Sequence, residues 1–449
     1  MPEQIGNTVG SGWLNPRRIK RQALLLAIAL WLIYAVTLAT PGMRDRVGHL
    51  KGADFLHSYV LGSLALEHRG DALYDAQIQR QAGEQLVPES RGDWFLPVYA
   101  PQYSLVWMPF ALLPYGWSAA LWGALSAAIY AACCYSVWRK CPALGDYGST
   151  VALSAAAFPG FFTLITFGQN SALALAAFAG AYFALRTRRE ILAGFCLGLL
   201  AYKPQLALAS ACVVLAVLAW PPSPRGNWRE GEGQKLLKTA GTTRAAAMKI
   251  MLGGLVSVCV QFAQARAWYG AGPLRNYLRV VTHIGAAASI LEPKPYLMHS
   301  LRAFWNLLLP WPGLAFLLYI LSALATLAVA IASWRSGAPL TQRCAVMLLA
   351  TVLVAPHLTV YDLVILAPAV LWIADWLASH ADSRIAWLLY LSCLLPFAGP
   401  LARWTHLQLS VISLAWLTGS FGVWLCRGEH AGSGMRTRLS VRNGCGCKL

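Results

Sequence analysis

Residues 17–40 read RRIKRQALLLAIALWLIYAVTLAT, a cluster of basic residues followed by an uninterrupted apolar run. The run over 22–40 is long enough to cross a ~30 Å hydrocarbon core as a helix, which takes about 20 residues. Segments on the cytoplasmic side of a membrane span carry an excess of Lys and Arg. The stretch therefore predicts a first transmembrane helix, with the N-terminal segment 1–21 in the cytoplasm.

The composition of the rest of the chain repeats this pattern. Of 449 residues, 57% are hydrophobic and only 12% are charged, and the mean hydropathy is +0.52, whereas a soluble chain carries about 25% charged residues. The following apolar runs have the length of a membrane span: 22–40, 116–137, 148–167, 170–185, 246–264, 312–334, 340–356, 360–378, 384–399 and 407–426.

A further apolar stretch, 191–220, is too long for one span. It is interrupted at Lys203-Pro204, where the proline removes a helix donor and the lysine is costly inside a bilayer. We interpret it as two short helices meeting at a surface. The sequence thus predicts an all-α polytopic bundle of about twelve transmembrane spans over 22–426, followed by a basic cytoplasmic tail over 427–449.

The distribution of charge tests this arrangement. The net charge of +18 is of a size found in nucleic-acid-binding proteins, but about +15 of it falls in the segments that the twelve-span alternation places inside, as membrane insertion requires. We expect membrane lipids and no nucleic acid as partners, and a multi-pass protein of the cell membrane with both termini cytoplasmic. No small-residue cleavage site follows Thr40, so the first span is expected to be retained.

The eleven cysteines all fall in predicted spans or inner segments, so outer disulfides are not expected. Cys445-Gly446-Cys447 lacks the two-residue spacing and the partner pair of a zinc site. We expect a plain tail there, and neither a metal site nor a cofactor anywhere in the chain.

Two predicted outer segments are long, 41–115 and 265–311, and long ordered loops usually carry function. Apolar residues recur at helical spacing through 54–69, which predicts a helix lying along the membrane surface. Asp54 stands at its start. It is either an N-cap, accepting backbone N–H groups, or a general base with His57 on the same helical face; the two roles do not exclude each other.

Other polar groups cluster at predicted outer turns. Tyr99-Ala100-Pro101 opens an apolar segment that prolines break into short pieces, typical of a re-entrant surface helix. Gly168-Gln169-Asn170 is a minimal turn, and His357 and Asp362 flank another; ordinary turn chemistry also explains both. Lys203 either snorkels to the surface or offers a fixed positive charge to a phosphate. The second outer segment adds further candidates, most of which loop solvation explains: Arg275, Arg279, His283, Lys294, His299 and Arg302.

The order of these motifs carries a resemblance. The matching residues are Asp54-Phe55 through Tyr59, Gly70, Leu73-Tyr74, Tyr99-Ala100-Pro101 with Pro109 and Pro114, Gly168-Gln169-Asn170, Gly194, Gly198 and Lys203-Pro204. Over roughly residues 50–370 the chain resembles glycosyltransferase family 87, also catalogued as domain of unknown function 2029, of the C-type glycosyltransferase superfamily. Similar enzymes include polyprenyl-phosphate-mannose-dependent α-mannosyltransferases of lipoglycan synthesis.

The resemblance implies transfer of a sugar from a polyprenyl-phosphate donor to a lipid or glycan acceptor on the outer face, with an essential aspartate that corresponds by position to Asp54. Two motifs depart from the family pattern. The aromatic-Pro-Pro element is Tyr99-Ala100-Pro101, and an Asn-Gln-Ser-like stretch appears as Met298-His299-Ser300. These departures leave the identity of the sugar and of the acceptor open.

The chemistry suits this reaction, because a lipid phosphate is already a good leaving group and a single base then suffices to deprotonate the acceptor hydroxyl. One essential carboxylate favours inversion, with Lys203 and His357 as candidates to hold the phosphate. A transporter or flippase also uses broken helices, although no internal repeat is found, and an inactive scaffold is a third reading. Further candidate site residues are His57, Tyr99, Gln169, Asn170, His299 and Arg302.

Overall fold

The structure is a computed structural model that describes residues 14–93, 95–220, 243–283 and 294–440, the last of these as backbone only beyond residue 427. The described residues form α-helices and short 3-10 helices, with two isolated β-bridges and no sheet. The all-α prediction is therefore confirmed. The inner segment 221–242, part of the second outer segment and the Cys445-Gly446-Cys447 tail lie outside the described residues.

The described residues of the first half supply ten α-helices. They are α1 (Pro16–Leu38), α2 (Ala53–Leu66), α3 (Ala76–Leu86), α4 (Pro101–Ala111), α5 (Tyr115–Trp138), α6 (Gly148–Ala156), α7 (Pro159–Phe167), α8 (Ser171–Arg186), α9 (Glu190–Gly198) and α10 (Leu208–Ala219). Two 3-10 turns, η5 (Leu199–Tyr202) and η6 (Pro204–Ala207), join α9 to α10 on either side of Lys203.

The described residues of the second half add nine α-helices and, between α17 and α18, the 3-10 turn η9. They are α12 (Arg244–Tyr269), α13 (Gly272–His283), α15 (Leu301–Leu308), α16 (Pro312–Arg335), α17 (Leu340–Val354), η9 (Val360–Leu366), α18 (Ala367–His380), α19 (Ser383–Leu394), α20 (Ala402–Thr405) and α21 (Leu409–Ser440). The last helix continues into the segment expected to be a tail.

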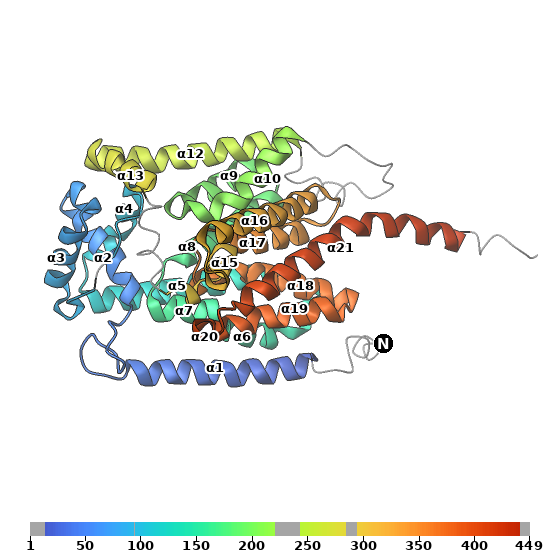
Figure 1. Ribbon diagram of the computed structural model, residues 1–449, viewed down its shortest axis with the longest axis horizontal. Coiled ribbons are helices and arrows are strands. Elements are labelled where there is room, and N and C mark those ends of the chain that lie inside the picture. The colour runs from blue at the N-terminus through green and yellow to red at the C-terminus, as the bar shows by residue number, and fades with distance from the viewer. Residues whose placement is uncertain (1–13, 94, 221–242, 284–293, 441–449) are drawn as a thin grey trace, which may run out of the picture.

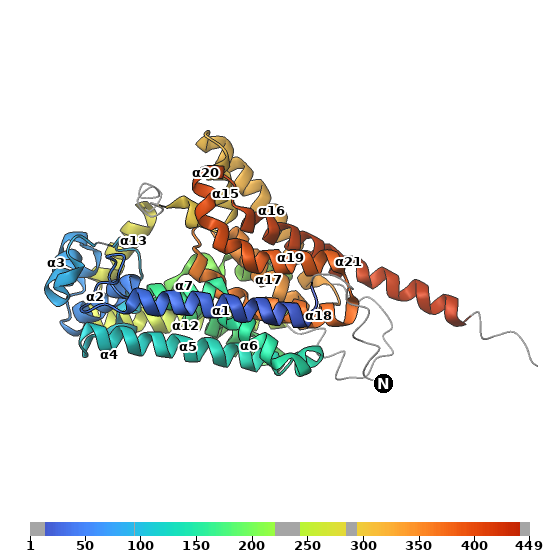
Figure 2. The same ribbon diagram turned by 90° about the horizontal axis from the view of Figure 1, so that it is seen from below.

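Helices α1, α5 and α12 run along one axis of the molecule (Figures 1 and 2). Figure 1 shows α2, α3 and α13 gathered at one end of the bundle, whereas α1 begins and α21 ends toward the opposite end. The view from below shows α15, α16 and α20 rising away from α1 and α5 at a steep angle (Figure 2). Among the described residues, the helices α2, α3 and α13 of the predicted outer segments thus lie at the opposite end from the start of α1 and the end of α21, which were predicted to be inside.

The predicted number of spans is only partly supported. Seven described helical segments are long and apolar enough to cross a membrane, and the α6–α7 region, bent by 46°, makes up to eight. The remaining predicted spans are short helices: α8, the two arms around Lys203, and α17. In α8, 11 of 16 residues are buried, and in α17, 13 of 15. These helices pack inside the bundle, so twelve full spans are not shown.

The first outer segment also differs from its prediction. The predicted surface helix begins where expected but ends at Leu66, and 10 of its 14 residues are buried. A Cβ at Gly62 would stand 2.5 Å from the carbonyl oxygen of Trp107 in α4, so the two backbones are in direct contact. Helix α2 is therefore a packed internal element rather than an exposed helix on the membrane surface.

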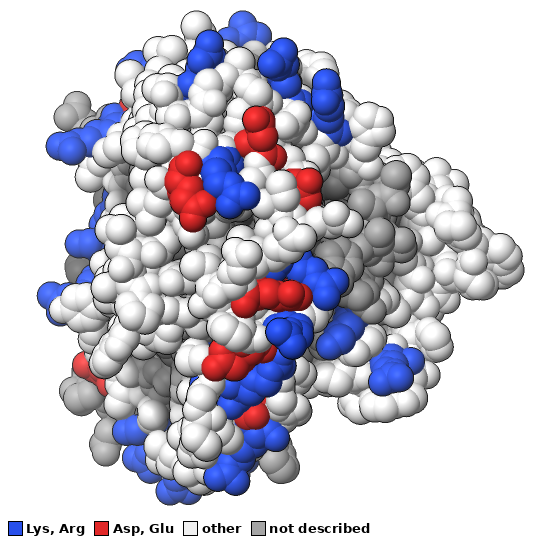
Figure 3. Space-filling model, turned by 90° about the vertical axis from the view of Figure 1, so that its left-hand side faces the viewer, with Lys and Arg blue, Asp and Glu red and all other residues white. Residues whose placement is uncertain are grey.

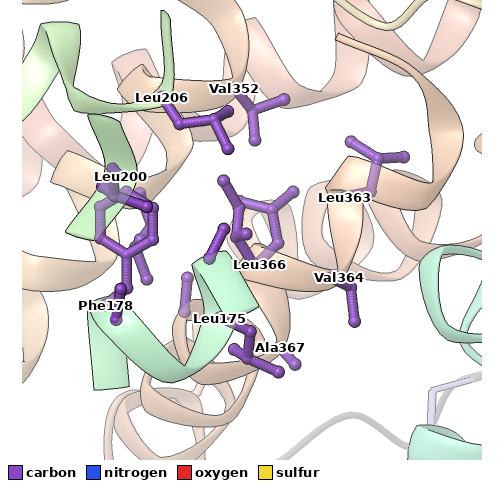
Figure 4. Close-up of a cluster of buried hydrophobic side chains, with 14 of the residues drawn as sticks. Leu175, Phe178, Leu200, Leu206, Val352, Leu363, Val364, Leu366 and Ala367 are labelled. Carbon is purple, nitrogen blue, oxygen red and sulfur yellow. The ribbon is translucent and has the colours of Figure 1, made fainter. Parts of the chain in front are cut away.

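Apolar side chains of the core join the break at Lys203 to η9. Leu200 of η5 and Leu206 of η6 lie across from Val352 of α17 and Leu366 of η9, and each is buried (Figure 4). Burying a leucine side chain contributes about 1.5–3 kcal/mol. This apolar contact holds the break around residue 203 against η9, because both elements contribute side chains to the same cluster.

Candidate active site

Two glycines bring the start of α2 against the turn between α7 and α8. Gly52 and Gly168 both have left-handed backbone conformations, with φ of 68° and 69°. A Cβ at Gly168 would lie 2.8 Å from the Cβ of Phe55 and 3.4 Å from the Cα of Gly52. Glycine adopts positive φ at little cost and leaves room for close approach. The contact places Asp54 next to Gln169.

Asp54 is held by a side chain rather than by its own helix. The N-cap of α2 is Gly52, and no side-chain capping bond is made there, so the N-cap interpretation of Asp54 is wrong. Instead, Gln169 Nε2 donates to Asp54 Oδ2 at 2.5 Å. Asp54 is partly exposed. A base that receives a proton from a substrate must be accessible in this way.

The surroundings of Asp54 alter its acidity. Burial raises the pKa of the Asp54 carboxyl above its ordinary value, because the charged form loses solvation, while the Gln169 hydrogen bond and the charge of Lys203 oppose this rise and the charge of Asp362 adds to it. A carboxylate with a raised pKa is a stronger proton acceptor. The position suits a general base.

Lys203 forms a buried ion pair. Its Nζ donates to Asp362 Oδ1 at 2.8 Å and to Ser171 Oγ at 3.1 Å, and it lies 5.3 Å from the ring centroid of Tyr361. Only 6% of Lys203 is exposed. The snorkelling interpretation is therefore wrong, since the ammonium is turned into the protein.

Asp362 is the site residue whose role the sequence did not reveal. It is 2% exposed, it accepts the Ser171 hydroxyl, and it completes a capping box by accepting the backbone N–H and hydroxyl of Thr359 at 3.2 and 3.1 Å. The Thr359-x-x-Asp362 spacing is the sequence signal that predicts such a box. Its pairing with Lys203, 159 residues away, has no local signal.

Aromatic and amide groups line the same turn. Asn170 Nδ2 donates to the hydroxyls of Tyr103 and Tyr99 at 2.6 and 3.1 Å, and these two rings stack with centroids 4.1 Å apart. The hydroxyl of Tyr202 donates to the backbone oxygen of Asn170 at 3.2 Å. The predicted residues Tyr99, Gln169, Asn170 and Lys203 therefore assemble around one turn beside Asp54, together with Tyr103, Ser171 and Tyr202, which were not predicted.

His57 turns to a different set of neighbours. Its ring stacks on Phe95 with centroids 4.9 Å apart and lies 5.4 Å from the ring of Tyr99. Burial lowers the pKa of His57 to about 4, so the imidazole is neutral at physiological pH. Its contacts are those of a packing residue, and its predicted partnership with Asp54 is not seen in them.

The remaining predicted residues are His299, His357 and Arg302. His299 is buried, bonds Ser410 Oγ through Nδ1 at 2.7 Å, and donates its backbone N–H to the oxygen of Leu358 at 2.8 Å; burial lowers its pKa to about 4. This backbone hydrogen bond joins the second outer segment to the turn that contains His357. His357 and Arg302, the latter on α15, are both partly exposed.

Four other acids of the first outer segment serve local structure. Asp75 caps α3 and Asp45 accepts backbone N–H groups within its own turn, while Glu67 and Glu84 form exposed salt bridges with neighbouring arginines. Figure 3 shows acidic and basic side chains interspersed on this end of the molecule. Within the described ranges, no group of three or more His, Cys, Asp or Glu side chains is placed to hold a metal ion.

The family of the chain follows from a direct match. The model of glycosyltransferase family 87 matches residues 97–356, more than half of the sequence. The chain belongs to glycosyltransferase family 87. It is thus a multi-pass membrane glycosyltransferase. A transporter would not account for this family match. The match includes Tyr99, Gln169, Asn170 and Lys203 but neither Asp54 nor the 357–362 turn, and no curated protein or solved structure matches the chain.

Proposed function

We propose that this glycosyltransferase moves a hexose, in the first instance mannose, from a polyprenyl-phosphate donor to a lipid- or glycan-type acceptor at the outer face of the cell membrane. The observation that carries the proposal is the setting of Asp54. Its partly exposed carboxylate is held by Gln169, in a turn whose next residues reach the buried Lys203–Asp362 pair. This combines a proton acceptor with a fixed positive charge.

In the proposed reaction, Asp54 takes the proton of the acceptor hydroxyl while that oxygen attacks the anomeric carbon of the donor sugar. The bond between this carbon and the phosphate oxygen breaks, and the electron pair leaves with the polyprenyl phosphate. General-base help of this kind contributes about 10²–10⁴-fold in rate. Lys203, through the Nζ proton that Ser171 and Asp362 do not use, and the partly exposed His357 are proposed to bind the phosphate as its charge develops.

The surroundings of the buried carboxylate Asp362 favour inversion. A retaining mechanism by double displacement requires a second carboxylate as nucleophile. Asp362 lies near Asp54, but its oxygens accept bonds from Lys203, Ser171 and Thr359. Because these contacts occupy it and shield it from substrate, Asp54 is left as the carboxylate available to the reaction.

The substitution Asp54→Asn tests the base. Asparagine keeps the size of the side chain and still accepts the Gln169 hydrogen bond, but it does not take up a proton at neutral pH. We expect normal insertion and a loss of at least ~10²-fold in the rate of mannosyl transfer, measured with purified protein and radiolabelled polyprenyl-phosphate mannose. The matched control is Asp75→Asn, which should retain the parental rate because asparagine caps helices as well as aspartate does.

Two results would count against the proposal. Near-parental turnover of a correctly inserted Asp54→Asn protein would remove Asp54 from the mechanism. Failure of the parental protein to use any labelled polyprenyl-phosphate sugar, tested with several hexoses, would reject the lipid-linked donor.

A further inference from the structure

One turn binds both carboxylates of the site. Gln169 donates to Asp54, and Ser171, two residues later, donates to Asp362 and accepts from Lys203. The side chains of alternate residues in this turn therefore reach the two acids, and Lys203 bonds to both Ser171 and Asp362. Gly168 packs the turn closely against α2, and Leu200 and Leu206, on either side of Lys203, are buried in the core.

We propose that Asp362 is a positioning residue for the transfer reaction: its carboxylate, anchored by Ser171 and Thr359, fixes the Lys203 ammonium beside the base Asp54. The inference rests on the proposed role of Asp54. It assigns a role to Asp362, which lies outside the family match and which the sequence marked only as the end of a turn, and it explains why a buried ion pair stands at this place.

Stability alone does not explain the pair. Burying two charges costs solvation that their attraction often fails to recover, and well-packed apolar residues at such positions are often equally or more stabilising. The pair is also close to the reacting group, since Gln169 bonds Asp54 and Ser171, in the same turn, bonds both members of the pair. A pair kept at the site in spite of its cost is consistent with a role in the reaction.

The two charges act on Asp54 in opposite directions. Lys203 favours the ionised carboxylate and Asp362 disfavours it, with Lys203 the stronger of the two. The tyrosines that face Asp54 are uncharged at neutral pH, given their ordinary pKa of about 10. The charged and titratable groups facing Asp54 are Lys203 between η5 and η6, Asp362 and Tyr361 of η9, Tyr99 before α4, and Tyr115 of α5.

The single variants should therefore shift the acid limb of the activity profile in opposite directions. In Asp362→Asn the Lys203 charge is no longer neutralised, so the pKa of Asp54 falls and the acid limb of kcat/KM moves to lower pH. In Lys203→Met the negative Asp362 remains, so the limb moves to higher pH. A neighbouring charge shifts a pKa by about one unit or more. We also expect Asp362→Asn to lower kcat at least ~10-fold on its plateau, because Lys203 is then free to pair directly with Asp54.

A readout that does not need turnover accompanies the kinetics. Water-soluble carbodiimide modifies protonated carboxyl groups, so the pH midpoint of Asp54 labelling, followed by peptide mass spectrometry, should shift in the same two directions. The double variant Lys203→Met/Asp362→Leu leaves no unpaired buried charge. It should fold at least as well as either single variant, and its Asp54 midpoint should lie between theirs.

The outcomes separate this inference from the proposed function. Loss of activity in Asp54→Asn together with opposite shifts in the two single variants supports both. If Asp54→Asn is inactive but the two midpoints do not move, or move in the same direction, the ion pair has only a structural role and the inference is overturned. If Asp54→Asn is active, the proposed base itself fails.

Discussion

Two aspartates of the site illustrate how surroundings assign roles to identical side chains. Asp54 is partly exposed and accepts a bond from one amide, whereas Asp362 is 2% exposed and is bound by an ammonium, two hydroxyls and a backbone N–H. When two carboxyl groups have such different surroundings, one can react while the other supports the site. The sequence supplied both aspartates but not the difference between them.

Gln169 should tune the base. Its hydrogen bond lowers the pKa of Asp54, so Gln169→Leu should raise that pKa and leave a larger fraction of Asp54 protonated in acid solution. A hydrogen bond to a charged group is worth about 1.5–3 kcal/mol, which corresponds to roughly ten-fold or more in rate. We expect a loss of about that size on the acid side and a smaller loss at alkaline pH, measured as kcat/KM against pH.

The control for this substitution is Gln85→Leu, at an exposed position of α3 in the same outer segment. It should leave the profile unchanged. An identical profile for Gln169→Leu and the parental protein would show that the Gln169 bond does not influence Asp54.

At the scale of elements, the sequence predicted the break between helices correctly but did not predict which helices are buried. The Lys203-Pro204 break lies between η5 and η6, where the sequence placed it, because proline and a charge are locally readable. Apolar spacing in α2 is equally compatible with lipid and with protein contact, so it did not reveal that α4 covers this helix. Ser171 and Asp362 are 191 residues apart, and such a pairing depends on the whole fold.

Close packing of α9 on α12 depends on glycine. A Cβ at Gly194 would lie 1.9 Å from the carbonyl oxygen of Ile250, and one at Gly253 would lie 1.9 Å from that of Ile191. Small residues allow helices in membranes to approach this closely. Gly194→Ala should therefore force the helices apart and destabilise the protein by about 1–3 kcal/mol or more, seen as a lower Tm in detergent.

Gly123 of α5 provides the matched control, since a Cβ there meets no atom within 4 Å. Gly123→Ala should leave the Tm unchanged or slightly higher, because alanine favours helix over glycine. Equal Tm values for the two variants would mean that α9 and α12 are not packed as described.

At the scale of the whole molecule, contacts and charges give independent evidence that the turns of the site share one end of the bundle. The hydrogen bonds among Asp54, Gln169, Lys203 and Asp362 require four turns, distant in sequence, to lie at the same end of the bundle. The Lys and Arg distribution placed those same turns outside without any knowledge of the contacts. A shift of one span in the alternation would have separated the turns, so the arrangement of spans is better determined than their number.

The orientation in the membrane is the last prediction. Gln85 is exposed on α3, at the end that carries the site, and Ser383 is exposed at the turn between α18 and α19, which the charge pattern places inside. In intact cells, a membrane-impermeant thiol reagent should label Gln85→Cys but label Ser383→Cys only after permeabilisation, relative to the parental protein with its own cysteines. Reversed labelling would put the site on the cytoplasmic face, where a nucleotide-linked sugar is equally accessible, and would remove the topological reason for a polyprenyl-phosphate donor. Labelling of both positions from the same side would contradict the alternation itself, because an odd number of crossings separates them.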